Sequence, residues 1–326
     1  MRKFAALLAL GTILVAGCAS ASGATRPSSG TIEKPTITVA VVPAVDSAGF
    51  FIALYQGLFK AQGLHVNFEP AVSSETVIQQ QVKGTVDISC GNYVSYLQAQ
   101  QSHEADLEIF AEGSVMLPGT QALYTMPKSK IASLQDLVGK TVGINAPDNI
   151  LYLLVASVLA DHGIPVNSVH FKSNIPLPAM AAALKSGQID AAVLPEPFAS
   201  EAQQQYGVAT LADLDQGATT DFPIQGCVAT RQWAALNPHT LAAFDQALQQ
   251  GQEIADTSRH AVEQAMEDLP MKPVPLGVSS LTSSVMAVDN YPVGPVNPIR
   301  LQHVADVMTE FIGFPSFDVR SMIGNP

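Results

Sequence analysis

Small polar and acidic residues recur directly after the stretches of this sequence that are expected to form β-strands. Asp46 and Ser47, for example, follow the apolar run at residues 37–42 and precede a helical pattern that begins at residue 49. The crevice of an open parallel sheet lies beyond the carboxyl ends of its strands, where helix N-termini leave N–H groups free for a ligand. The sequence therefore predicts ligand-binding residues in these turns. The candidates, which include one aromatic residue and one glycine, are Asp46, Ser47, Phe50, Ser73, Ser74, Gly91, Asn92, Asn149, Asn174 and Glu196.

The residue types in these turns leave the nature of each contact open. Ser73, Asn92 and Asn149 could cap their own helices, contact a ligand, or do both. The charges are more informative, because five acids lie in or beside the turns and Lys172 is the only base near them. An oxyanion pocket often contains arginine or lysine, since charge-assisted hydrogen bonds are the strong ones. We therefore expect a neutral or amine-bearing ligand, such as a heterocycle, rather than nitrate or sulfonate. The five acids are Asp46, Glu75, Glu112, Asp148 and Glu196.

Signatures of several other chemistries are missing from the sequence. The turn at residues 46–49 has neither the dinucleotide fingerprint Gly-Xaa-Gly-Xaa-Xaa-Gly nor Gly-Lys-Ser. The serine-nucleophile motif Gly-Xaa-Ser-Xaa-Gly does not occur, and the seven histidines form no pair at metal-ligand spacing. The net charge of −12 also disfavours nucleic acid, whose binding depends on basic patches. We expect no catalytic residue, no metal or other cofactor, and no nucleic-acid partner.

The N-terminus has the features of an export signal. Arg2 and Lys3 precede an apolar stretch at residues 4–15 that is short for a membrane span. The following Val15-Ala16-Gly17-Cys18 resembles a bacterial lipobox, which implies cleavage of a signal peptide at residues 1–17 and lipidation of Cys18. The small and polar residues that follow suit a flexible tether, which we expect to span residues 18–35. These features predict an extracytoplasmic protein anchored to the cell membrane through Cys18.

Strand and helix patterns alternate along most of the chain. Short apolar runs alternate with helices of ten or more residues from residue 37 to residue 111, and again from residue 121 to residue 205. This alternation predicts βαβ units and mainly parallel sheets. An extended stretch follows at residues 223–230, and the last third is helical, with helices expected at 238–257, 258–268, 278–287 and 298–312. The pattern predicts two α/β lobes, with the helical tail packing on the first lobe.

These elements give a division of the mature chain into lobes. We assign residues 36–119 and 230–326 to the first lobe and residues 120–229 to the second. Cys90 and Cys227 fall in two apolar, strand-like segments. An oxidising compartment would allow a disulfide, but buried free cysteines are the interpretation that we favour.

Several phrases of the sequence, taken together, resemble one protein family. In order, they are FIALYQGLFKAQGL at 51–64, KGTVDI at 83–88, SLQDLVGKTVG at 133–143, ALKSGQIDAA at 183–192 and Glu196-Pro197. The chain thus resembles the ABC-importer solute-binding proteins of the nitrate, sulfonate, taurine and thiamine-pyrimidine group. The resemblance implies a two-lobe periplasmic-binding-protein fold of type II with a ligand cleft between the lobes. It also implies a small-molecule ligand and ABC permease and ATPase subunits as partners.

Two other functions are compatible with this resemblance. Some members of the group synthesise the thiamine pyrimidine with a cysteine cluster and a reactive histidine near the pocket. The comparable segment here, Ser89-Cys90-Gly91-Asn92-Tyr93, has one cysteine, and the export signal also argues against synthesis. The second alternative is a receptor component that reports ligand to a sensor without transport, which the sequence does not distinguish from import.

Overall fold

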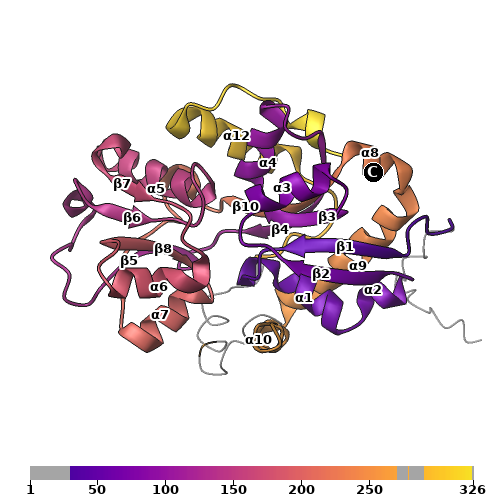
Figure 1. The fold of residues 1–326 in the computed structure, drawn as a ribbon, viewed down its shortest axis with the longest axis horizontal. Coiled ribbons are helices and arrows are strands. Elements are labelled where there is room, and N and C mark those ends of the chain that lie inside the picture. The colour runs from indigo at the N-terminus through magenta and orange to yellow at the C-terminus, as the bar shows by residue number, and fades with distance from the viewer. Residues whose placement is uncertain (1–29, 270–277, 279–289, 325–326) are drawn as a thin grey trace, which may run out of the picture.

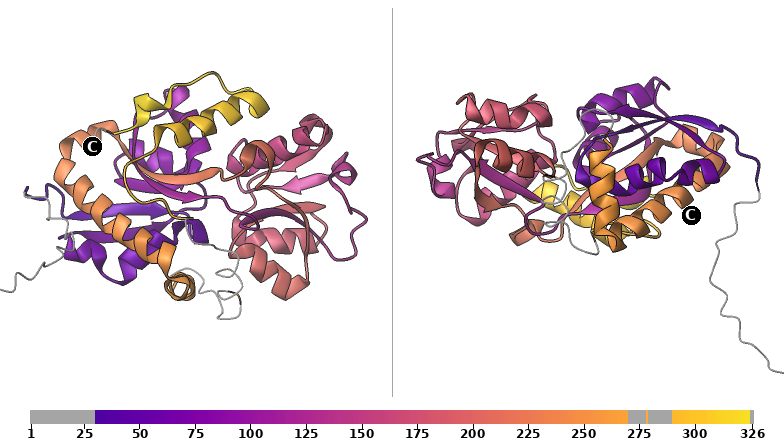
Figure 2. Two further views of the ribbon diagram at one scale, coloured as in Figure 1. Left: turned by 180° about the vertical axis from the view of Figure 1, so that it is seen from behind. Right: turned by 90° about the horizontal axis from the view of Figure 1, so that it is seen from below.

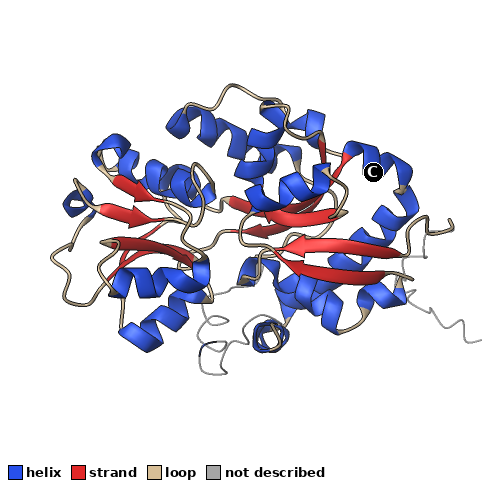
Figure 3. Cartoon of the chain, in the orientation of Figure 1, coloured by secondary structure: helices blue, strands red, loops and turns tan. Residues whose placement is uncertain are grey.

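The computed structural model of the chain describes residues 30–269, 278 and 290–324. These residues form two α/β lobes that lie side by side, each built on a five-stranded sheet (Figure 1). Helices cover the faces of both sheets (Figure 3). The helix expected at 278–287 lies almost entirely outside the described residues. Within the described part of the chain, none of the helices is long and apolar enough to span a membrane.

The sheet of the first lobe has the strand order β2-β1-β3-β10-β4. β1 runs parallel to β2 and β3, whereas β10 is antiparallel to both of its neighbours. The strands are β1 (Thr36–Val41), β2 (His65–Pro70), β3 (Ile88–Asn92), β4 (Leu107–Val115) and β10 (Pro223–Thr230). The helices are η1 (Val45–Ser47), α1 (Ala48–Tyr55), α2 (Leu58–Ala61), α3 (Ser74–Val82), α4 (Tyr93–Gln101), α8 (Arg231–Leu236), α9 (Pro238–Thr257), α10 (Arg259–Glu267), α12 (Pro298–Ile312) and η5 (Val319–Met322).

The sheet of the second lobe has the order β7-β6-β8-β5-β9. β6 runs parallel to β7 and β8, and β5 is antiparallel to β8. Its strands are β5 (Gln121–Thr125), β6 (Thr141–Gly143), β7 (His170–Lys172), β8 (Ala191–Pro195) and β9 (Ala209–Asp213), the last of which the sequence analysis missed. Its helices are η2 (Leu134–Leu137), α5 (Ile150–Asp161), η3 (Val166–Ser168), α6 (Leu177–Lys185), α7 (Phe198–Tyr206) and η4 (Gly217–Thr219).

Two details at the start of the chain differ from the predictions. The helix expected to begin at residue 49 is divided into α1 and α2 by Gly57, which has a left-handed φ of 73° that other residues resist. The tether expected to end at residue 35 is too long, because Lys34 Nζ lies 2.6 Å from Asp87 Oδ1 and Glu33 Oε2 accepts a hydrogen bond from Thr240 N–H. The first lobe therefore holds the chain from Glu33 onward.

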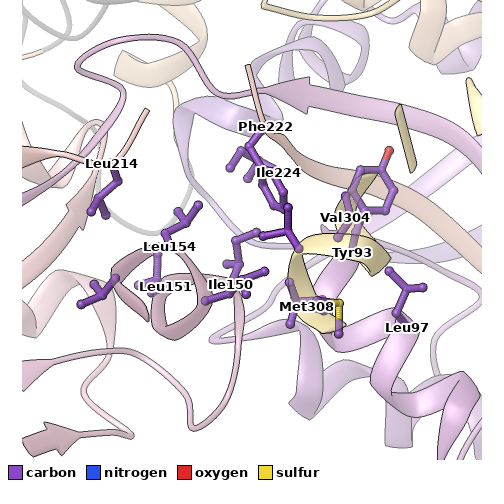
Figure 4. Packing of buried hydrophobic residues seen from close by; sticks show 14 of the residues in the cluster. Tyr93, Leu97, Ile150, Leu151, Leu154, Leu214, Phe222, Ile224, Val304 and Met308 are labelled. Carbon is purple, nitrogen blue, oxygen red and sulfur yellow. The ribbon is translucent and has the colours of Figure 1, made fainter. Parts of the chain in front are cut away.

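The chain passes between the lobes after β4 and returns before β10. Because β10 pairs with β3 and β4, residues 223–229 belong to the sheet of the first lobe, and the expected boundary at residue 229 is wrong for this strand. α12 packs against α4 of the first lobe and also against α5 of the second (Figures 1 and 2). Figure 4 shows this apolar contact, in which Met308 of α12 lies between Leu97 of α4 and Ile150 of α5. The tail thus joins the lobes instead of packing on the first alone.

Cys90 and Cys227 form a disulfide, so the expectation of two free cysteines is wrong. The residues face each other across the antiparallel pair β3 and β10, with their Cα atoms 4.1 Å apart. The two residues are 137 positions apart in the sequence, so no local pattern predicts that they pair. The bond closes a loop that contains the whole second lobe, and it fixes β3 to β10 in the first.

Candidate ligand-binding site

A small cavity lies between the two lobes. Its volume is about 60 Å³, well below the roughly 300–1,000 Å³ that is typical of pockets for drug-sized ligands. The first lobe lines it with Val42, Ala44, Asp46, Ser73, Ser74, Gly91, Asn92, Ile224 and Gln225. The second lobe contributes Gln121, Asn145, Asn149, Ile150, Leu151, Leu177 and Pro195. Six of the ten candidate residues therefore meet at one place: Asp46, Ser73, Ser74, Gly91, Asn92 and Asn149.

The wall from the first lobe is a hydrogen-bonded pair of turns. Ser74 Oγ accepts hydrogen bonds from both the backbone N–H and the side-chain Nδ2 of Asn92, each at 2.9 Å. Asn92 Oδ1 accepts Ser95 N–H and so caps α4 while the residue also lines the cavity. Gly91 permits this packing, because a Cβ there would lie 2.2 Å from Ser74 Oγ. Capping and cavity lining therefore coexist at Asn92.

The start of α5 contributes three of the residues with which the second lobe lines the cavity. Asn149 caps this helix, since its Oδ1 accepts Leu151 N–H at 3.1 Å. The Nδ2 of the same residue donates to Asn145 Oδ1 at 2.7 Å, which ties the end of the β6 segment to the helix. Ile150 and Leu151 add apolar surface beside these amides. This side of the cavity therefore combines amide groups with apolar side chains and carries no charge of its own.

Asp46 is the one ionisable side chain on the described lining. It lies in η1, is 9% exposed, and accepts a hydrogen bond from Ser114 Oγ at 3.2 Å. Burial raises the pKa of this carboxyl to about 6, against the smaller opposing effect of the Ser114 hydroxyl. Lys172, the one base expected near the turns, does not reach the lining, and no other lysine or arginine is found on the described cavity wall. The cavity is therefore electrostatically suited to a neutral or positively charged group.

Three polar residues of the lining, Asn145, Gln121 and Gln225, were not among the candidates. The two glutamines were overlooked because they do not follow parallel strands. Gln121 opens β5, and its Oε1 is buried without a hydrogen-bond partner among the described residues. Gln225 lies in β10, where its Nε2 donates to the Asp46 carbonyl at 2.6 Å. Gln121 begins, and Gln225 interrupts, a mostly apolar strand near a crossing between the lobes. The signal available in the sequence was an amide residue in a mostly apolar strand.

The structure places four of the candidates outside the cavity lining. Phe50 is 2% exposed and packs in an aromatic cluster with Phe59 and Phe244, because it points to the inner face of α1. Ser47 lies behind the lining, where its hydroxyl donates to Val42 O at 3.0 Å. Asn174 is exposed at a left-handed turn. Glu196 lies just before α7, where its carboxylate accepts hydrogen bonds from Ser200 N–H and Oγ–H.

The comparisons with known proteins bear on this site and its fold. The sequence model of the NMT1-like family matches residues 30–268, which is more than half of the chain. The chain belongs to the NMT1-like family. The family match and the solved structures together confirm the expected likeness to the nitrate and sulfonate group of solute-binding proteins.

Solved structures related to this NMT1-like protein share its two-lobe fold. The alkanesulfonate-binding protein SsuA from Xanthomonas axonopodis pv. citri, solved with MOPS bound, has a TM-score of 0.77 at 17% identity; the match covers 91% of this chain and 100% of SsuA. The periplasmic nitrate-binding protein NrtA from Synechocystis PCC 6803 has a TM-score of 0.73 at 16% identity, covering 88% of this chain and 83% of NrtA. These likenesses confirm the type II periplasmic-binding-protein fold.

One curated relative also has an ABC-transport name. The bicarbonate transport ATP-binding protein CmpC from Synechocystis sp. is 26% identical over 255 residues, which are 71% of this chain. The matched part is 37% of CmpC, so the NMT1-like chain spans much less than half of that relative.

Proposed function

We propose that this NMT1-like protein is an extracytoplasmic solute-binding lipoprotein of an ABC importer that performs no chemistry. It binds a small organic molecule between its lobes and delivers it to a permease–ATPase complex. The observation that carries the proposal is the cavity between the lobes, to which each lobe contributes amide side chains. Its neutral and acidic lining supports a heterocyclic or amine-bearing ligand over nitrate or sulfonate. The SsuA and NrtA folds, whose names state anionic ligands, support the class of function and not the ligand.

The mechanism would be a ligand-driven shift toward closed lobes. Lobe-to-lobe contacts at the cavity edge already include the hydrogen bond from Val45 N–H to Glu196 O at 3.2 Å and that from Gln98 Nε2 to Asp148 O at 2.8 Å. A ligand that contacts Asn92 on one side and Asn149 on the other adds interactions that exist only when the lobes are together. Such a differential contact is what shifts a two-state equilibrium.

The export features complete the proposal. Cleavage after residue 17 and lipidation of Cys18 would anchor the two lobes outside the cell membrane, with the tether ending before Glu33. The rival enzymatic function, which needs reactive cysteine, is disfavoured because Cys90 is bonded to Cys227. A sensing role would use the same cleft. Uptake of labelled ligand, measured in cells with and without the protein, distinguishes the two roles, because only import requires the protein for uptake.

A thermal-shift screen with Asn149→Ala tests the proposed function. A ligand at 100 times its Kd should raise the free energy of unfolding by about 2.7 kcal/mol. Asn149→Ala should reduce this ligand-induced shift because the residue lines the cavity, whereas the matched variant Asn174→Ala, at an exposed position outside the lining, should retain it. The shift is compared with and without ligand in each variant, so the lost helix cap of Asn149→Ala cancels. Turnover of a solute, or equal shifts in both variants, would contradict the proposal.

A further inference from the structure

Two buried polar side chains of the cavity lining lack a balancing partner among the described residues: the Asp46 carboxylate has no cation beside it, and Gln121 Oε1 has no hydrogen-bond donor. The Asp46 carboxylate is 9% exposed and accepts hydrogen bonds from the Ser114 hydroxyl and from its own backbone N–H. Asp46 forms no ion pair within the described residues. Gln121 is 2% exposed, and its Oε1 has no partner within the same residues. Both residues line the same small cavity, one from each lobe.

Two further donors near Asp46 do not bind its carboxylate. The Gln225 amide donates to the Asp46 carbonyl oxygen and to Ser47 Oγ instead of the carboxylate. The Tyr291 hydroxyl donates to Val45 O at 2.8 Å, and burial beside Asp46 holds its pKa well above the ordinary value. These two donors are thus used for the backbone of η1 and for Ser47, and the charge of the Asp46 carboxylate has no positive partner among the described residues.

A buried carboxylate that has hydrogen bonds but no cation beside it is unfavourable by itself. A buried charge is costly unless it is paired and hydrogen-bonded, and a buried acceptor without a donor also loses its hydration. Both costs fall if the molecule that enters the cavity brings several N–H donors and a positive charge. An anion would have the opposite effect, because it would face Asp46 and the Gln121 oxygen with further acceptors.

We propose that the ligand carries an ammonium group that donates hydrogen bonds to the Asp46 carboxylate of the first lobe and to Gln121 Oε1 of the second. This inference rests on the proposed function and names the ligand class of that same site. The ammonium group has three donors, enough to satisfy both acceptors at once. Because the acceptors belong to different lobes, the group would hold the lobes together as well as identify the ligand. The cavity of about 60 Å³ restricts the rest of the molecule to a small body beside Ile150 and Leu151.

Calorimetric titration of the full mature protein with matched small molecules tests the ammonium assignment. The probes are ethylammonium, ethanolammonium and 1,4-diaminobutane, each beside its hydroxyl counterpart, together with nitrate and ethanesulfonate. We expect binding of at least one amine and weaker binding of its hydroxyl counterpart and of both anions. Asp46→Asn should lower the affinity for that amine by about tenfold to a hundredfold, since a hydrogen bond to a charged group is lost. Gln121→Met should lower it by a smaller factor.

Asp245→Asn is the matched control. Asp245 is another acid of the first lobe whose pKa burial raises to about 6, but it lies outside the cavity between the lobes. Its replacement should leave amine affinity unchanged. Circular dichroism of each variant verifies folding, so a loss of affinity can be assigned to the changed side chain.

The possible failures are distinguishable. If a hydroxyl compound or an anion binds more tightly than the amines and Asn149→Ala weakens that binding, the ammonium assignment is overturned while the proposed function stands. Unchanged amine affinity in Asp46→Asn would likewise overturn the assignment. If neither the probes nor any small molecule extracted from the purified protein binds, both the assignment and the proposed function fail.

Discussion

Replacing Asp46 with asparagine should make the unliganded protein more stable at neutral and alkaline pH. Asparagine keeps the shape of the side chain and can still accept the Ser114 hydroxyl, but it carries no charge into a site that is 9% exposed. A residue whose charge reduces stability in the absence of ligand is better explained by binding than by folding. The prediction therefore bears on the role of Asp46 without knowledge of the ligand.

The size and pH dependence of the effect follow from the raised pKa of Asp46. The value in the folded protein is about 6, against an ordinary value of 3.8, and burial is the main cause. Between these two pH values the folded protein retains a proton that the unfolded chain has lost, so the free energy of unfolding decreases as the pH rises through this window. Above pH 6 the full cost, about 3 kcal/mol, is present. Asparagine has no proton to lose and escapes this cost.

Urea unfolding at pH 3.5 and pH 8 measures the difference. Trp233, the single tryptophan of the sequence, lies in α8 of the first lobe and reports its unfolding by fluorescence. Wild type and Asp46→Asn should have similar free energies of unfolding at pH 3.5, and the variant should exceed wild type by up to about 3 kcal/mol at pH 8. A variant that is less stable than wild type at pH 8 would refute the reasoning, because it would show that the folded protein compensates the charge.

Three further predictions concern the disulfide, the joint between the lobes and the cavity wall. Reduction of the Cys90–Cys227 disulfide should lower the free energy of unfolding by up to about 5 kcal/mol, because the bond closes a loop of 137 residues in the unfolded chain. The double variant Cys90→Ala/Cys227→Ala is the control and should not respond to reductant. A loss below about 1 kcal/mol in the wild type would contradict a stabilising role of the disulfide. Met308→Ala, at a fully buried position between α4 and α5, should cost about 2–5 kcal/mol in thermal or urea unfolding, whereas a cost near zero would mean that the lobes do not pack there. Gly91→Ala should weaken ligand binding in a calorimetric titration, because its Cβ would lie 2.2 Å from Ser74 Oγ; unchanged affinity would remove the contact between Ser74 and Asn92 from the site.

The architecture could be predicted because its signals are local. Apolar runs that alternate with helical patterns predicted nine of the ten strands, and the same alternation, together with the family phrases, predicted the two lobes. The errors needed information from beyond the local pattern. β9 pairs with β5 at the edge of its sheet and carries exposed residues, so its sequence lacks a strong strand pattern. The sheet to which β10 belongs, and with it the disulfide, depends on a register across more than a hundred residues.

The site was partly predictable for a similar reason. The rule that ligands bind beyond parallel strands selected Asp46, Asn92 and Asn149, which the structure brings to one cavity. The same rule overlooked Gln121 and Gln225, because they lie within strands beside the crossings between the lobes. The rule also does not specify which way a side chain points, and so it included Phe50, whose ring belongs to the core.

The central claim, that a solute is held between the lobes by groups from both, has one direct test. The small molecule extracted from the purified protein is identified by mass spectrometry and titrated calorimetrically into wild type, Asp46→Asn and Asn149→Ala. The account predicts one molecule bound per chain, with affinity reduced by both the first-lobe and the second-lobe substitution. Binding that neither substitution weakens, or that only one lobe's substitution affects, would contradict it.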